Sequence, residues 1–202
     1  MLKKIRSLAS NSDFIEIYDN VLTHQECDRL IHLFEKSKKM SGFVVADGVP
    51  TEDFGVKKGS EVEDARFSKG DSISNFIKPF LFSCIDRYAA TYPGLGHLSS
   101  WKYDDGYTFK KFESEDDGFK KWHTEHGPLS ISNRILVWMF YLNNAKCGTE
   151  FKHYPTVQAK MGRLIIWPAF WTHLHRGVLP NKGLKYIITG WASYKHNMED
   201  FE

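Results

Sequence analysis

Residues 121–128 have the sequence KWHTEHGP, and residues 167–178 have the sequence WPAFWTHLHRGV. In the first stretch, His123 and Glu125 are two positions apart. Residues i and i+2 of an extended strand project to the same face, so this imidazole and this carboxylate converge. The second stretch adds further imidazoles after an apolar segment rich in β-forming residues. Together the two stretches predict a metal site that organises the fold around it.

The third ligand is one of two histidines, His173 or His175, and the local pattern leaves both open. Two histidines and one carboxylate, with other positions free, are the ligand set of non-heme Fe(II) oxygenases. A solitary His-x-Glu also arises by chance, in which case these residues are structural. Further residues at fitting positions are therefore needed to support the metal site. His126, adjacent to Glu125, points to the opposite face and is not expected to bind the metal.

Composition excludes several classes of protein. The 202 residues are 42% hydrophobic and 15% aromatic, enough for a packed core in one domain. Net charge is +2, from 27 basic and 25 acidic residues, which gives no electrostatic footprint for nucleic acid or an anionic membrane. Three widely spaced cysteines indicate a reducing compartment. No signal peptide or membrane-spanning run is evident, so a cytoplasmic protein is expected.

The N-terminal half predicts helices. Residues 14–19 alternate as a strand, and Thr23 with Glu26 forms a capping box that begins a helix ending near residue 37. Apolar residues at helical spacing predict a second helix over 72–92. Between the helices, the glycine-rich segment 41–72 shows little periodicity and is expected to be a partly ordered lid or substrate loop.

The C-terminal half predicts strands. We expect them over residues 107–112, around His123 and Glu125, and over 134–142, 163–167 and 185–191, the third being apolar on both faces. Helices followed by strands indicate the α+β class. No domain boundary is evident, so residues 1–202 are expected to be one domain, helix-rich over 1–100.

Two side chains on the later strands can bind a dicarboxylate. Lys185 stands among apolar residues and must reach water or find an anion. It is either an exposed edge lysine or the partner of a bound carboxylate. Tyr141 can donate to the same carboxylate, or it is a buried tyrosine with a backbone partner. Trp191 shares a strand face with Lys185 and can line this site. The tryptophans at 122, 138, 167 and 171 are expected in the core.

The chain resembles the 2-oxoglutarate/Fe(II)-dependent dioxygenases, in particular the prolyl 4-hydroxylase branch. The resemblance rests on His123-x-Glu125, residues 134–143, the GTEF sequence at 148–151, His175 and residues 185–191. An N-terminal element at 18–30 and Arg66-Phe67-Ser68 are similar to the same branch.

The resemblance implies a double-stranded β-helix (jelly roll), with a core over about 101–195 and the N-terminal helices packed on one sheet. It implies iron ligands His123, Glu125 and His175, with His173 in a supporting role. Lys185, ten residues after His175, and Tyr141 are implied to hold 2-oxoglutarate. The implied cofactors are Fe(II), 2-oxoglutarate and O2, with ascorbate as a possible addition, and the implied reaction is hydroxylation of a C–H bond in a prolyl residue of a protein or peptide.

The chain departs from the family pattern at two places. Glu125 stands where the family usually has aspartate, and Phe112 stands where related enzymes often have a tyrosine. Three alternatives remain: a hydroxylase of a free amino acid or other small molecule, a halogenase, or a non-catalytic jelly roll that binds a metal or ligand. Halogenases lack the metal carboxylate, so Glu125 argues against that class.

Overall fold

The structure is a computed structural model that describes residues 4–5, 13–41, 44–46, 49–51, 57–62, 72–114, 117–127, 129–177 and 183–195. Within these residues, Thr23 begins helix α1 (His24–Lys36) as predicted. The Thr23 hydroxyl accepts from the Glu26 amide at 3.3 Å, and the Glu26 carboxylate accepts from the Thr23 amide at 2.7 Å. These two bonds satisfy donors that a helix start otherwise leaves unpaired, so the capping box fixes where α1 begins. Helix α2 (Ser72–Thr91) confirms the second predicted helix.

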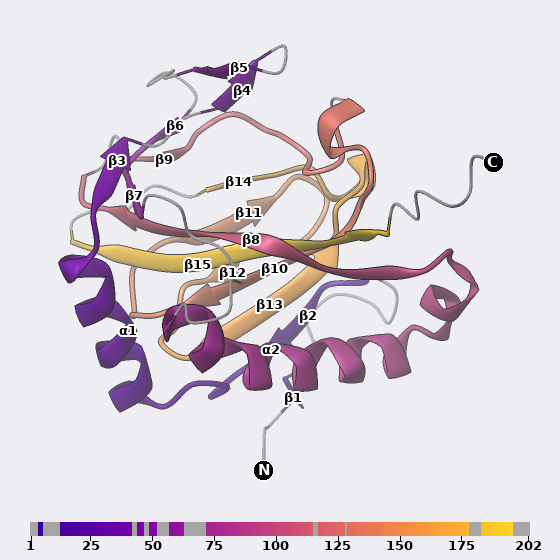
Figure 1. The fold of residues 1–202 in the computed structure, drawn as a ribbon, viewed down its shortest axis with the longest axis horizontal. Helices are drawn as coiled ribbons and strands as arrows, with labels where there is room; N and C mark the ends of the chain where they lie inside the picture. Colours follow the sequence, from indigo (N-terminus) through magenta and orange to yellow (C-terminus); the bar gives the residue numbers. More distant parts are fainter. Residues whose placement is uncertain are drawn as a thin grey trace.

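Most described strands belong to one antiparallel sheet, the major sheet (Figure 1). Across that sheet the order is β1 (Lys4–Ile5), β2 (Glu16–Tyr18), β13 (Arg163–Pro168), β10 (Arg134–Tyr141), β15 (Lys185–Tyr194), β8 (Trp101–Phe112), β7 (Ser60–Val62) and β3 (Lys39–Ser41). A minor sheet has the order β12 (Val157–Gln158), β11 (Gly148–Phe151) and β14 (His175–Gly177). Two strand pairs complete the described β structure, β4 (Val44–Ala46) with β5 (Val49–Thr51) and β6 (Lys57–Lys58) with β9 (Gly118–Phe119).

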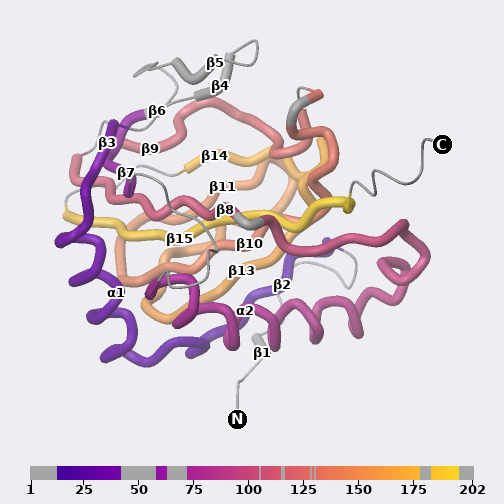
Figure 2. The backbone as a smooth tube through the Cα atoms, in the orientation of Figure 1, coloured from indigo at the N-terminus to yellow at the C-terminus, as the bar shows by residue number. Residues whose placement is uncertain are grey.

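The major sheet is buried on both faces. On β10, Trp138 and Phe140 join one core cluster, which also contains buried residues of α1 and α2. Val137 and Tyr141 point the other way into a second cluster, shared with Phe151 of the minor sheet. This alternation explains why residues 135–142 are apolar without interruption. Figures 1 and 2 show the chain path, with both helices on one side of the strands and β14 on the other.

Two predictions about local structure need correction. The described residues 121–127 do not form a strand; His123 makes an isolated bridge to His175, and the chain then bends. The described parts of 41–72, predicted to be partly ordered, include short strands, of which β7 pairs with β8. Trp171 is 75% exposed and is not a core residue, because it lies in the short 3-10 turn Trp171–His173. Arg66-Phe67-Ser68 lies outside the described residues.

The remaining core predictions hold except at Trp122. All three cysteines are buried and unpaired. Trp138 and Trp167 are fully buried, whereas Trp122 is partly exposed, with the Arg176 guanidinium 4.6 Å from its ring centroid. Among the described residues, no helix is long and apolar enough to cross a membrane.

A buried carboxylate joins the turn after β2 to β13. Asp19 is 1% exposed, and its oxygens accept from Arg163 Nε at 2.7 Å and Lys160 Nζ at 2.8 Å. Burial opposes ionisation, but hydrogen bonds from Arg163 and Lys160 outweigh it and hold the pKa of Asp19 below its usual value. A carboxyl whose pKa is lowered by folding stabilises the fold above its unfolded-state pKa, and this contribution is lost as the pH falls through the folded-state pKa.

Asp19→Asn should therefore lower the free energy of unfolding at pH 7 by about 3 kcal/mol, because two cations lose a buried partner. Chemical denaturation at a series of pH values measures this. The difference from the unmodified chain should shrink as the pH falls below the ordinary carboxyl range. Asp86→Asn, at an exposed position on α2, is the matched control and should change stability by less than about 0.5 kcal/mol. A pH-independent loss in Asp19→Asn would contradict the electrostatic explanation.

Candidate metal centre

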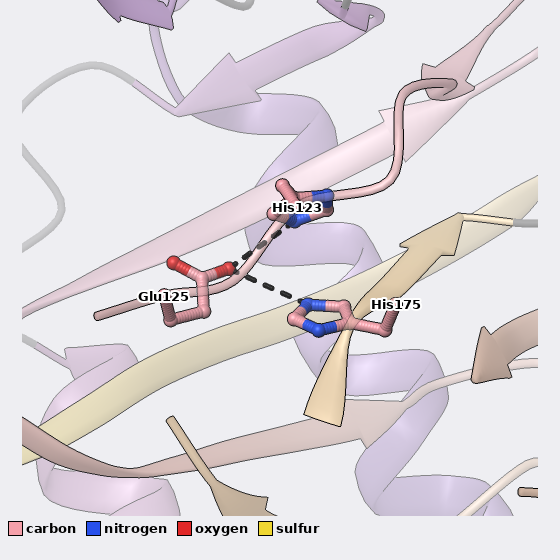
Figure 3. A group of neighbouring side chains, drawn as sticks. All are labelled: His123, Glu125 and His175. Carbon is pink, nitrogen blue, oxygen red and sulfur yellow. Dashed lines mark ion pairs between the residues drawn. The ribbon is translucent and has the colours of Figure 1, made fainter. Parts of the chain in front are cut away.

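Two imidazoles and one carboxylate converge on a single point (Figure 3). The potential ligand atoms of His123, Glu125 and His175 all lie within 4.8 Å of one another. Glu125 Oε1 is 3.5 Å from His123 Nε2 and 3.7 Å from His175 Nε2. The structure thus brings together the three residues that the sequence suggested, although two come from a bent segment and one from a strand.

Backbone hydrogen bonds fix where these side chains start. His123 and His175 exchange both of their backbone hydrogen bonds, each at 3.0 Å, so the two residues are directly opposite each other. Their ring centroids are 4.3 Å apart. The Ala169 carbonyl then accepts from the amides of Glu125 and His126 and from the Thr124 hydroxyl. This bend, rather than a strand, puts Glu125 beside the two imidazoles.

The hydrogen bonds of the two histidines fix which ring nitrogen faces Glu125. His123 Nδ1 lies 3.0 Å from the Lys121 carbonyl, and His175 Nδ1 lies 2.9 Å from the His173 carbonyl. A carbonyl oxygen only accepts, so each Nδ1 donates a proton and each Nε2 is the ring nitrogen that faces Glu125. An Nε2 beside an ionised carboxylate is favourable only with a proton or a metal ion between the two atoms, and a metal ion can take the place of that proton. This arrangement of donors fits a metal ion.

The protonation states also suit a metal ion. Burial, reinforced by the neighbouring His175, lowers the pKa of His123 and favours its neutral form. Burial acts to raise the pKa of Glu125, but the imidazoles of His123 and His175 hold it well below its usual range. Neutral imidazole and ionised carboxylate are the forms that bind metals.

The second oxygen of Glu125 has its own partners. Glu125 Oε2 accepts from Arg134 Nη1 at 3.2 Å and from Trp191 Nε1 at 3.0 Å. The Arg134 guanidinium carbon lies 3.7 Å from the centroid of a Trp191 ring. No role for Arg134 was predicted from the sequence. The feature that could have pointed to it is a cation at the start of a strand that is otherwise apolar on both faces.

His173 lies outside this group. Its Nε2 is 2.8 Å from the Asp13 carbonyl, and its Nδ1 is 2.9 Å from the Thr172 hydroxyl. Its ring stacks on Tyr154 with centroids 5.0 Å apart. Because both nitrogens are engaged and the ring is buried, His173 supports the site through its backbone carbonyl, which accepts from His175. His126 is also outside the group, with Nδ1 2.9 Å from the Arg134 carbonyl.

Lys185 and Tyr141 belong to the same interior face of the major sheet. Tyr141 pairs with Ile187, and Lys185 lies two residues from Ile187, so its side chain projects to the same side. Lys185 is 3% exposed, with its ammonium 4.9 Å from the Phe112 ring centroid, and burial lowers its pKa. It is not the exposed edge lysine that the sequence left possible. Tyr141 is fully buried, and its hydroxyl lies 2.6 Å from the Thr149 hydroxyl, with the Thr149 backbone as a further hydrogen-bond partner.

Comparison with known proteins gives a match in structure. No protein-family model matches the chain, and no curated protein matches its sequence. The viral collagen prolyl hydroxylase of Paramecium Bursaria Chlorella virus-1, as its 2OG complex, matches with a TM-score of 0.65 and 15% identity, covering 92% of this chain and 98% of its own. A Trichoplax adhaerens prolyl hydroxylase, in complex with a peptide fragment of hypoxia inducible factor, matches with a TM-score of 0.69 and 16% identity, covering 91% and 84%.

A Pseudomonas putida prolyl-4-hydroxylase also matches, with a TM-score of 0.59 and 12% identity, covering 91% of this chain and 94% of its own. The chain therefore has a fold similar to that of prolyl 4-hydroxylases and 2OG-Fe(II) oxygenases. At these identities the similarity shows the fold alone, so the chemistry of the site is inferred from its residues.

Replacing each candidate distal histidine in turn tests which one binds the metal. His175→Ala should weaken metal binding by more than about 100-fold, because removing a residue that merely hydrogen-bonds a ligand already costs about 10- to 100-fold. His173→Ala should leave the affinity nearly unchanged, since its carbonyl remains to hold His175. Titration calorimetry with Co(II), and with Fe(II) under argon, measures both. Equal losses in the two variants would contradict the assignment of His175.

Proposed function

We propose that the chain is an Fe(II)- and 2-oxoglutarate-dependent dioxygenase that hydroxylates a prolyl residue in a protein or peptide. The observation that carries the proposal is the convergence of His123, Glu125 and His175, with both Nε2 atoms facing Glu125 Oε1. The similarity in fold to prolyl hydroxylases supports it. We take residues 1–202 as one such domain, with a jelly-roll core over about 101–195 and the N-terminal helices on the major sheet.

The donor set favours iron when it is considered with the rest of the interior. Two histidines and one carboxylate suit Fe(II), although zinc hydrolases also use two histidines and a glutamate. The interior lysine Lys185 favours iron, since zinc hydrolysis does not call for a lysine that is 3% exposed on the same sheet face as Tyr141. A dicarboxylate cosubstrate would use it, because a bond between an ammonium and a carboxylate is strong where water is excluded.

Under this proposal each residue has a separate task. Fe(II), 2-oxoglutarate and O2 when bound supply the oxidising chemistry, coupling decarboxylation to succinate and CO2 with hydroxylation of a C–H bond. His123, Glu125 and His175 hold the metal. Lys185 fixes the far carboxylate, and the Tyr141 hydroxyl, now paired with Thr149, is placed to donate to it. The apolar side chains around them exclude water.

The proposed prolyl substrate is supported by the similarity in fold to known hydroxylases and by β6, a described strand within segment 41–72. Strand β6 pairs with β9, and Phe119 of β9 stacks on His123 with ring centroids 3.7 Å apart. A segment tied to a metal-binding residue in this way is well placed to cover a substrate, so we keep the expectation that it acts as a substrate loop. The implied partner is a protein or peptide chain.

Formation of succinate from 2-oxoglutarate tests the proposed reaction. With Fe(II) and O2 the unmodified chain should form succinate, and His123→Ala should not. Lys185→Met, which keeps most of the packing, should weaken 2-oxoglutarate binding by about 30-fold or more while leaving Co(II) affinity nearly unchanged. Calorimetry under argon measures both affinities.

The outcomes separate the alternatives. Succinate formation that increases with a proline-containing peptide supports the prolyl substrate, whereas an increase with free amino acids alone points to a small-molecule hydroxylase. Metal binding without 2-oxoglutarate binding would leave a non-catalytic metal-binding jelly roll. Equal loss of metal and 2-oxoglutarate affinity in Lys185→Met would contradict the task assigned to Lys185.

A further inference from the structure

The two oxygens of Glu125 have different surroundings. Oε1 faces the two imidazoles, whereas Oε2 accepts from Arg134 and Trp191. We propose that Arg134 and Trp191 are positioning residues that hold Oε2 so that Glu125 presents a single oxygen to the metal. This inference rests on the proposed function, because it concerns the carboxylate of the same site.

The length of the Glu125 side chain explains why a clamp, the name used here for the two donors Arg134 and Trp191, is needed. A glutamate has one more methylene than an aspartate and therefore one more rotatable bond to restrain. An unrestrained carboxylate can also turn to place both oxygens on a metal, which would use a position needed by a cosubstrate. Two N–H donors on Oε2 oppose that rotation, and the charged donor makes the stronger of the two bonds.

The strand register shows how Arg134 reaches the site. Regular alternation from Val137 would place residue 134 on the helix side of β10. The pairing of β10 with β15 is irregular between Arg134 and Leu136, and Ile135 and Leu136 both join the helix-side core. This irregularity turns Arg134 toward Glu125, as β-bulges commonly re-aim one side chain.

Trp191 lies beside a second irregularity, in which the extra residues are on β8. The pairing of β15 with β8 shifts between Gly190 and Ala192, the residues on either side of Trp191. Trp191 stacks on the guanidinium of Arg134, which restrains that long side chain. The two donors thus order each other as well as Glu125.

The clamp can be tested through the metal rather than through turnover. Trp191→Phe keeps an aromatic ring and removes the N–H, and Arg134→Met keeps an unbranched apolar stem and removes the charge. Each should weaken Co(II) binding by about 10- to 100-fold. Each should also change the visible absorption of bound Co(II), which depends on the number of ligand atoms. Trp138→Phe, on the helix side of β10, is the control and should change neither.

A double-mutant cycle separates a clamp from general destabilisation. Glu125→Asp shortens the side chain by one methylene and withdraws it from both donors. In that background Trp191→Phe should have almost no further effect on Co(II) affinity, because the bond it removes is already lost. Circular dichroism of the metal-free variants confirms that they are folded.

The results separate a failure of the clamp from a failure of the proposed function. If the unmodified chain binds Co(II) and both single variants bind it with unchanged affinity and spectrum, the clamp is wrong and the proposed function stands. If Trp191→Phe has the same effect in the unmodified chain and in the Glu125→Asp variant, the clamp is also wrong, since the coupling is absent. If the unmodified chain binds no metal, the proposed function and the clamp fall together.

Discussion

The convergence of two imidazole Nε2 atoms on one carboxylate oxygen is the constraint on which the site depends. Carbonyl groups accept from both Nδ1 atoms of His123 and His175, so neither ring can turn its Nε2 away from Glu125 without losing a hydrogen bond. Burying this carboxylate is costly unless a proton on the imidazoles or a metal ion balances its charge. The exchange of backbone bonds between His123 and His175 and the bend at Ala169 are the means by which the chain maintains it.

The central strands β10 and β15 contribute side chains to two hydrophobic cores, one on each face of the sheet. The face to which a residue points therefore decides whether it can contribute to the site. Alternate side chains face the helices, and the rest face the interior that holds Lys185, Tyr141 and Trp191. A slip of one residue would exchange the two sets, so burial on both faces fixes the register strongly. The irregularity beside Arg134 departs from this alternation on β10 and brings an arginine to the interior. Trp191 keeps the alternation of β15, because the extra residues of the second irregularity lie on β8.

The sequence predicted features that depend on near neighbours. The capping box of Thr23 and Glu26, the helical spacing before Tyr88 and the uninterrupted apolar run after Arg134 each follow from local rules. The bend after His123 depends instead on the Ala169 carbonyl, which is more than forty residues away in the chain. The same holds for the bonds from Arg134 and Trp191 to Glu125. Such contacts have no local pattern, so the sequence suggested the ligands and not what positions them.

Charge completes the argument for an anionic cosubstrate. Glu125 and Arg134 are in contact, and the charge of Asp104 also acts on Arg134. A divalent metal would add positive charge to an interior that already holds the ammonium of Lys185 beside Phe112. Coulombic attraction is stronger where apolar groups exclude water, so an anion bound with the metal would be favoured there over a neutral ligand. Under the proposal, the two carboxylates of 2-oxoglutarate would meet the metal and Lys185.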